Sequence, residues 1–103
     1  YHEYSYHLIL DGFFTGMGYQ VLSETESGYG RSDLMILDPA RSCCLILELK
    51  HVKKEEGLEA ALQEAASQIV TRKYESRLRY QGYTNRIQYA IAFWEKRARV
   101  VGV

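Results

Sequence analysis

The sequence predicts a single α/β domain, in which a central mixed sheet is flanked by helices and the elements follow the order α-β-β-β-α-β-β. Three observations support this prediction. The 103 residues are close to the common size of one domain with one hydrophobic core. Two apolar segments have the three- and four-residue spacing of helices, and five shorter segments have the patterns of strands. The helical segments are interspersed with strands, and this order is typical of helices packed on the faces of one sheet.

The first helix is expected over residues 2–17. Apolar side chains recur there every three or four residues, so they should form one face of an amphipathic helix. Gly16 and Gly18 are of the residue type that typically ends a helix. The side chains expected on the buried face are Tyr6, Ile9, Leu10, Phe13, Phe14 and Met17.

Three strands are expected next. Residues 19–24 alternate between apolar and polar side chains, which is typical of a strand with one buried face. Residues 32–38 and 43–50 are continuous apolar runs, as expected for central strands that are covered on both faces. Pro39, the single proline of the chain, marks the turn between these two runs.

The second half of the chain is expected to form a helix and a closing pair of strands. Residues 55–74 have the clearest helical pattern, and their alanines at 60, 61, 65 and 66 suggest close packing against a sheet. The face expected to be buried holds Leu58, Ala61, Leu62, Ala65, Ile69 and Val70. Residues 87–94 and 98–103 should pair across a charged turn. Because the helix separates the third strand from the fourth, those two strands should be parallel neighbours.

The composition, with 47% hydrophobic and 25% charged residues, is that of an ordinary soluble globular protein. No apolar run approaches the ~18 to 20 residues of a membrane span, and no signal-peptide pattern occurs. Cys43 and Cys44 are adjacent in a strand, where their side chains point to opposite faces, so neither a disulfide nor a shared metal between them is expected. We therefore expect a reduced, cytoplasmic protein. The sequence begins within a helical pattern and without a methionine, so we expect a domain excised from a longer chain.

Charge is distributed unevenly along the chain, although the formal net charge is zero. Residues 1–49 hold seven acids against two arginines, and residues 50–103 hold eleven lysines and arginines against six glutamates, so the halves carry about −5 and +5. An acidic cluster beside a basic surface is typical of a metal site that acts on a polyanion. Two solvated faces of different charge would give the same pattern.

The residues most informative about function are the charged ones at the ends of the two central strands. Asp33 begins the first of these strands, and Glu48 and Lys50 leave one face of the second, two residues apart. If the strands pair antiparallel around Pro39, Asp33 lies beside Glu48 and Lys50. Two carboxylates with the backbone carbonyl of Leu49 suit a hard cation such as Mg²⁺. A lysine beside them can hold an attacking water and offset charge that develops on a phosphate.

The segments "GRSD" and "LILELK" follow a helix and a strand, and they precede an alanine-rich helix with "AASQIVTRKY". In this order they resemble the PD-(D/E)XK nuclease superfamily, and more narrowly the nuclease-like domain that follows an AAA-ATPase-like module in many bacterial proteins. The resemblance covers nearly the whole chain and implies a restriction-endonuclease-like fold. It also implies that Asp33 and Glu48 are metal ligands and that Lys50 acts at the nucleophilic water. The proline of the signature is absent, since Ser32 precedes Asp33, but this departure removes no ligand.

The resemblance implies further site residues, and two of them have a plainer alternative. Gln68 matches a glutamine that supports the active site or contacts substrate, and its alternative is a glutamine at the margin of a solvated face. Glu3 matches an acid that several members contribute from the first helix. Glu24, at the end of the first strand, is a further candidate carboxylate, or a solvated strand end. His7 shares the helix face of Glu3, and we expect a satisfied packing residue there rather than a ligand.

Contacts to a nucleic-acid backbone are expected from basic residues interleaved with tyrosines. The expected set is Arg31, Lys73, Tyr74, Arg77 and Arg79, with Tyr80, Tyr83 and Arg86 nearby. Arg31 has a second interpretation, an ion pair with Glu24 or Glu26.

Together these residues predict a metal-dependent deoxyribonuclease that uses Mg²⁺ or Mn²⁺. It should select branched or single-stranded DNA by structure rather than by sequence, because a small core leaves little room for base-reading insertions. Expected partners are DNA, an ATPase-like module in the parent chain and a second copy in a homodimer. The alternative is a catalytically idle module on the same fold that docks nucleic acid or protein. In a third interpretation the domain is purely structural, and Glu48 and Lys50 form a simple ion pair.

Overall fold

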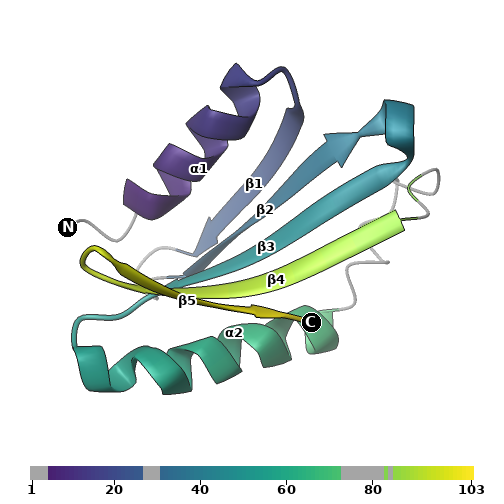
Figure 1. Cartoon of the computed structure of the whole chain (residues 1–103). Coiled ribbons are helices and arrows are strands. Elements are labelled where there is room, and N and C mark those ends of the chain that lie inside the picture. Colours follow the sequence, from purple (N-terminus) through teal and green to yellow (C-terminus); the bar gives the residue numbers. More distant parts are fainter. Residues whose placement is uncertain (1–4, 27–30, 73–82, 84) are drawn as a thin grey trace.

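The computed structural model describes residues 5–26, 31–72, 83 and 85–103. It is an α/β sandwich in which a five-stranded mixed sheet lies between two described helices (Figure 1). The predicted order of elements is confirmed. The elements are α1 (Ser5–Gly16), β1 (Gln20–Glu26), β2 (Arg31–Asp38), β3 (Cys43–His51), α2 (Leu58–Arg72), β4 (Asn85–Trp94) and β5 (Arg97–Gly102), with single 3₁₀ turns at Pro39–Arg41 and Glu55–Gly57.

The strands lie in the sheet in the order in which they occur in the chain, from β1 to β5. Neighbouring strands are antiparallel except β3 and β4, which are parallel because α2 carries the chain back across the sheet between them. The parallel pairing predicted from the intervening helix is therefore confirmed. The two long apolar runs, β2 and β3, occupy the interior of the sheet, and this explains their lack of alternation.

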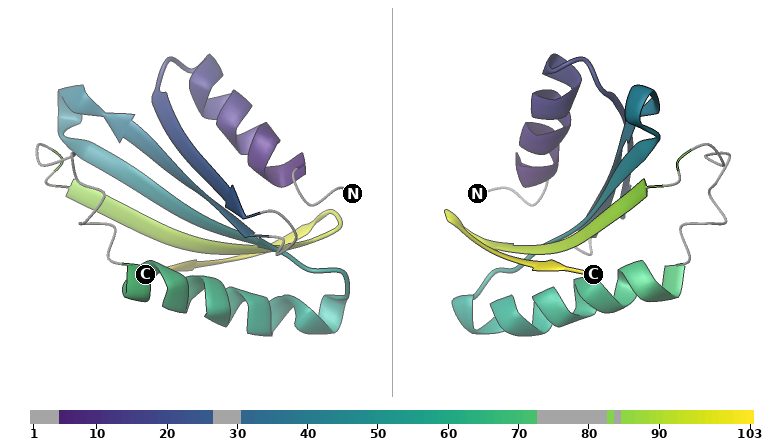
Figure 2. Two further views of the ribbon diagram at one scale, coloured as in Figure 1. Left: turned by 180° about the vertical axis from the view of Figure 1, so that it is seen from behind. Right: turned by 45° about the vertical axis from the view of Figure 1, so that its right-hand side comes forward.

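The two helices cover opposite faces of the sheet (Figure 2). α2 packs on β3, β4 and β5, and α1 packs on β1 and β2. Each helix closes its own apolar layer. The layer under α2 is built around Met35, Ile46, Leu62, Ala65 and Ala90, and the layer under α1 around Leu34, Ile36, Leu47 and Leu49.

α1 buries a different face from the predicted one. Leu10 and Phe14 pack against the core, as expected. Ile9, Phe13 and Met17, however, are 67%, 59% and 58% exposed, so their predicted burial is wrong. The reason is that apolar side chains occur all around this helix, and periodicity alone cannot then select the face that meets the sheet.

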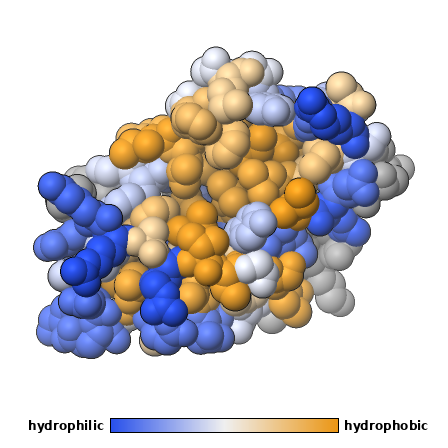
Figure 3. Space-filling view, viewed as in Figure 1, coloured by the Kyte–Doolittle hydropathy of each residue, from blue (hydrophilic) through white to orange (hydrophobic). Residues whose placement is uncertain are grey.

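The face of the sheet that carries α1 stays partly open beyond the helix. Ile87 and Tyr89 of β4 and Val100 of β5 are among the exposed large apolar side chains. A space-filling view shows apolar side chains gathering over the middle of this face (Figure 3). A single helix is therefore too narrow to cover this face of the sheet beyond β1 and β2.

α2 follows the predicted pattern with two exceptions. Ala61 and Ala65 are buried against the sheet, which confirms the close packing expected from the alanines. Ala60 is exposed and Val70 is 67% exposed, so both lie outside the buried face. Residues 55–57 form a 3₁₀ turn instead of the first helical turn, and residues 73 and 74 lie outside the described part of the chain.

The cysteines are free thiols, as predicted. Cys44 is fully buried under α2, whereas Cys43 is half-buried. Of the described helices, neither has the length and apolarity to cross a membrane.

Candidate active site

The centre of the site is a pair of acids that lie directly opposite each other in the β2–β3 hairpin. In the antiparallel register, Asp33 pairs with Glu48. Pro39 starts a 3₁₀ turn between the strands, and Ser42 closes it in the left-handed conformation with φ 50°. This turn sets the register, so the juxtaposition predicted from the sequence is confirmed.

Both acids are buried on the α2 face of the sheet. Asp33 is 1% and Glu48 0% exposed. Met35 and Ile46, each two residues away along its strand, belong to the apolar layer under α2, so the acids share that face. Small side chains of α2, Ala61 and Ala65, belong to the same layer. The result is two carboxyl groups enclosed between a sheet and an alanine-lined helix.

Lys50 also belongs to this face, and its ammonium group meets a partner that the sequence did not indicate. Lys50 Nζ lies 2.8 Å from Glu64 Oε1 of α2. The Lys50 side chain is 16% exposed and that of Glu64 52% exposed. The purely structural interpretation required an ion pair between Lys50 and Glu48; the ion pair formed is with Glu64.

A comparison with known families identifies this arrangement. A model of the PD-(D/E)XK nuclease superfamily matches residues 1–102. The chain belongs to the PD-(D/E)XK nuclease superfamily. The resemblance to this superfamily and the restriction-endonuclease-like fold are thus confirmed. No curated protein and no solved structure matches the chain.

Nucleases of the PD-(D/E)XK superfamily generally use divalent metals. In this member, Leu49 lies between Glu48 and Lys50 in β3, and its side chain is buried in the layer on the opposite face. Within the described residues, no three His, Cys, Asp or Glu side chains come together as a metal-binding group. The acid pair is therefore the largest such donor set that the described residues offer at this point.

Two further predicted residues lie beside the acid pair. Glu24 stands opposite Asp33 in the β1–β2 register, so Glu24, Asp33 and Glu48 form one row across three strands. Glu24 itself is exposed, at the open edge of this row. Gln68 is half-buried on α2, one helical turn after Glu64 and at the edge of the face that carries Ala65.

His7 differs from its expected role. The imidazole is 5% exposed and, among the described residues, its Nδ1 atom has no hydrogen-bond partner. Burial lowers the pKa of His7, while the nearby carboxylates of Asp11 and Asp33 act in the opposite direction. His7 is therefore a buried histidine that is not satisfied by hydrogen bonds at Nδ1, close enough to Asp33 to be influenced by its charge.

The start of α1 packs against the end of the sheet at which β3 and β4 terminate. The Tyr6 ring stacks on Phe93 at 4.3 Å between centroids, and its hydroxyl donates a hydrogen bond to the carbonyl of Glu95. Tyr6 also lies 5.4 Å from the His51 ring. The beginning of α1 therefore meets the ends of β3 and β4, near Lys50.

Several predicted site residues lie outside the part of the chain that the structure describes. Glu3, Lys73, Tyr74, Arg77, Arg79 and Tyr80 lie outside the described residues, as does the side chain of Arg31. Arg86 is exposed at the start of β4, while Tyr83 packs against the core layer under α2. Tyr83 is thus a packing residue rather than part of an exposed binding face.

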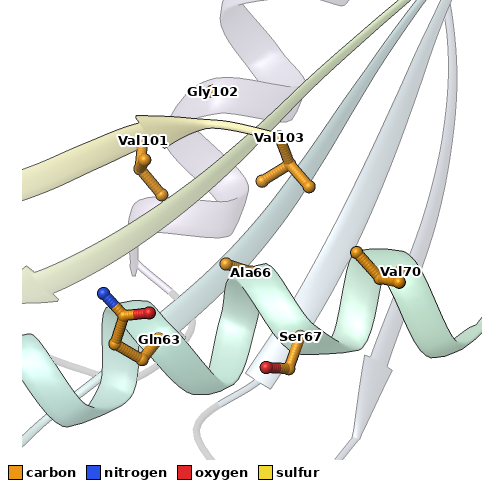
Figure 4. A pocket seen from close by; sticks show the side chains of 7 residues that line it. All are labelled: Gln63, Ala66, Ser67, Val70, Val101, Gly102 and Val103. Carbon is orange, nitrogen blue, oxygen red and sulfur yellow. The ribbon is translucent and has the colours of Figure 1, made fainter.

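Two hollows flank the site. A polar one of about 200 Å³ lies where β3 ends and is lined by His51, Val52, Lys53, Trp94 and Glu95. A more apolar groove of about 370 Å³ lies between α2 and the end of the chain, where Val101 and Val103 stand over Ala66 and Val70 (Figure 4). No side chain that lines the groove is titratable, so the polar hollow is better suited to accommodate a charged ligand.

Proposed function

We propose that this domain is a metal-dependent deoxyribonuclease that hydrolyses phosphodiester bonds. The observation that supports it best is the buried, in-register pair of Asp33 and Glu48, with Lys50 on the same face of β3. Two acids placed opposite each other inside a protein destabilise the fold unless a cation or another donor compensates them. A purely structural sheet would gain more from apolar residues at both positions.

The donor set fits Mg²⁺ or Mn²⁺. The carboxylates of Asp33 and Glu48 and the backbone carbonyl of Leu49 supply oxygen atoms, which these hard cations prefer. Glu3 and Glu24 are further candidate ligands, and waters and phosphate oxygens would complete the set, since Mg²⁺ keeps several waters in protein sites. A cation held there would make a water more acidic and offset the negative charge of the phosphate.

The remaining residues have roles in orientation and binding. Lys50 would donate hydrogen bonds to the attacking water or to a phosphate oxygen, and Gln68 would support the acid pair from α2. Exposed Lys53 and Lys54 follow β3 beside the polar hollow, where their charges would attract a nucleic-acid backbone. Arg31, Lys73, Tyr74, Arg77 and Arg79 would extend this contact.

The finer aspects of the function follow from the size and position of the site. A 103-residue domain has few elements with which to contact base edges, so we expect selection of branched or single-stranded DNA by its structure. An ATPase-like module in the parent chain, or a second copy in a homodimer, would supply additional contacts to DNA in the cytoplasm.

The test is a cleavage assay of the 103-residue chain on plasmid, branched and single-stranded DNA, with Mg²⁺, Mn²⁺ or EDTA. Cleavage should require the cation and be lost in Asp33→Asn. Removal of the Lys50 ammonium in Lys50→Ala should lower the rate about 10²- to 10³-fold. The matched control is Asp38→Asn, at the other end of β2, where Asp38 pairs with Arg41 at 2.7 Å. If none of these DNAs is cleaved by a folded wild-type protein, the proposal is wrong.

A catalytically idle binding module is the second candidate. One observation favours it: the described residues contain no three-residue metal-binding group. An idle module would bind DNA equally well with and without Mn²⁺ and with Asp33→Asn. A cation requirement for cleavage would exclude it.

A further inference from the structure

The ion pair between β3 and α2 suggests a role for an acid that lies outside the nuclease signature. We infer that Glu64 is a positioning residue, which holds the Lys50 ammonium group in the orientation needed for cleavage. The inference rests on the proposed function, because it presumes that Lys50 acts on the water or the phosphate.

Without a partner, the Lys50 side chain would be mobile. A lysine side chain has four rotatable bonds, and fixing them costs about 2 kcal/mol of conformational entropy. The Lys50 side chain lies mostly beneath α2, with 16% of its surface exposed, and its Nζ emerges 2.8 Å from Glu64 Oε1. A charge-assisted hydrogen bond of this length fixes the position of the ammonium before substrate arrives.

The helix that carries Glu64 is rigidly held on the sheet. Ala65, the next residue, is fully buried against the sheet, so the backbone at Glu64 is fixed relative to β3. Ala61 and Ile69 are also buried in this layer, so the helix is held to the sheet on both sides of Glu64. Glu64 therefore fixes the flexible Lys50 side chain relative to a packed helix.

The Glu64 ion pair differs from another ion pair of α2. Glu59 pairs with Arg99 of β5 at 3.2 Å, but both side chains are 57% exposed. Such exposed pairs contribute about 0 to 1 kcal/mol to stability. The Glu64 pair differs because its cation is largely buried and lies two residues from Glu48 in β3.

The test compares Glu64→Ala with Glu59→Ala, its matched control on the same helix. In Glu64→Ala we expect kcat to fall about tenfold with KM changed less than about twofold, because the ammonium is misplaced while DNA contacts remain. Glu64→Gln, which keeps an acceptor oxygen at the same length, should recover part of kcat. Glu59→Ala should cleave as the wild type does. In a Lys50→Ala background, Glu64→Ala should cause no further loss.

A second readout does not depend on activity. In the wild-type protein with EDTA, the ¹H–¹⁵N signal of the Lys50 ammonium should be protected from exchange with water, and Glu64→Ala but not Glu59→Ala should broaden it. Equal cleavage by Glu64→Ala and Glu59→Ala, or faster cleavage by Glu64→Ala, overturns the inference while the proposed function stands. A wild-type protein that cleaves no DNA overturns the proposed function, and with it the catalytic role of Glu64.

Discussion

Asp33→Asn should stabilise the metal-free domain while removing its response to divalent cations. Asp33 and Glu48 are opposite each other and almost fully buried, so their carboxylates repel each other whenever both are ionised. For two charges about 5 Å apart at an effective dielectric constant of about 20, this repulsion is about 3 kcal/mol. Asparagine has nearly the shape of aspartate, so the variant removes the charge with little change in packing. We expect the free energy of unfolding to rise by about 1 to 3 kcal/mol in EDTA.

The assay is urea unfolding followed by circular dichroism, in EDTA and in Mn²⁺. Mn²⁺ at about 100 times its dissociation constant should stabilise the wild type by about 2.7 kcal/mol, because it binds only the folded state. Asp33→Asn should not respond to Mn²⁺. Asp38→Asn, which loses only the half-exposed pair with Arg41, should lose about 0 to 1 kcal/mol and keep the full response.

Two outcomes would refute this reasoning. A wild-type midpoint that is identical in EDTA and in Mn²⁺ would show that the acid pair binds no cation. An Asp33→Asn variant that is less stable than wild type in EDTA would show that the contacts of Asp33 outweigh its repulsion by Glu48.

Three further predictions concern burial. Burial raises the pKa of Cys44 to about 11 from 9.0. In Cys43→Ser, which leaves Cys44 as the one thiol, the reaction with iodoacetamide at pH 8 should be about 100-fold slower in the folded protein than in urea. Equal rates would contradict this prediction. The pKa of His7 is lowered below 6.5, so the neutral imidazole favours the folded state. This contribution to stability should be complete above pH 6.5 and be lost as the pH falls toward the pKa of the folded state. As the pH is lowered, the urea midpoint of His7→Gln should therefore decline less than that of His51→Gln. Ala65→Leu should lower the free energy of unfolding by about 1 to 3 kcal/mol through overpacking, whereas exposed Ala60→Leu should change it by less than about 0.5 kcal/mol.

The fold could be predicted wherever the pattern of side chains has one physical solution. The runs at β2 and β3 are apolar on both faces, and only central strands bury both. The orientation of α1 could not be predicted, because Leu8, Ile9 and Phe13 give it apolar surface on the side away from the sheet. Which face is buried depends on the neighbouring strands, and this information is not local to the helix.

The acid pair could be predicted because a single hairpin turn fixes it. The partners that other elements bring to the site could not. Glu64 is one of two glutamates on α2, and only the docking of that helix on β3 distinguishes it from Glu59. The hydrogen-bonding state of His7 depends likewise on the packing of α1.

The two acids lie in consecutive strands of one hairpin, with every element after residue 51 still to follow in the chain. Their spacing is therefore set by a local piece of the polypeptide, whereas Glu64, which holds Lys50, and most of the positive charge are contributed by later segments. Substitutions in those later segments would change how substrate is bound without moving the acids. Domains of this kind can therefore diverge in substrate binding while they keep the same acid pair.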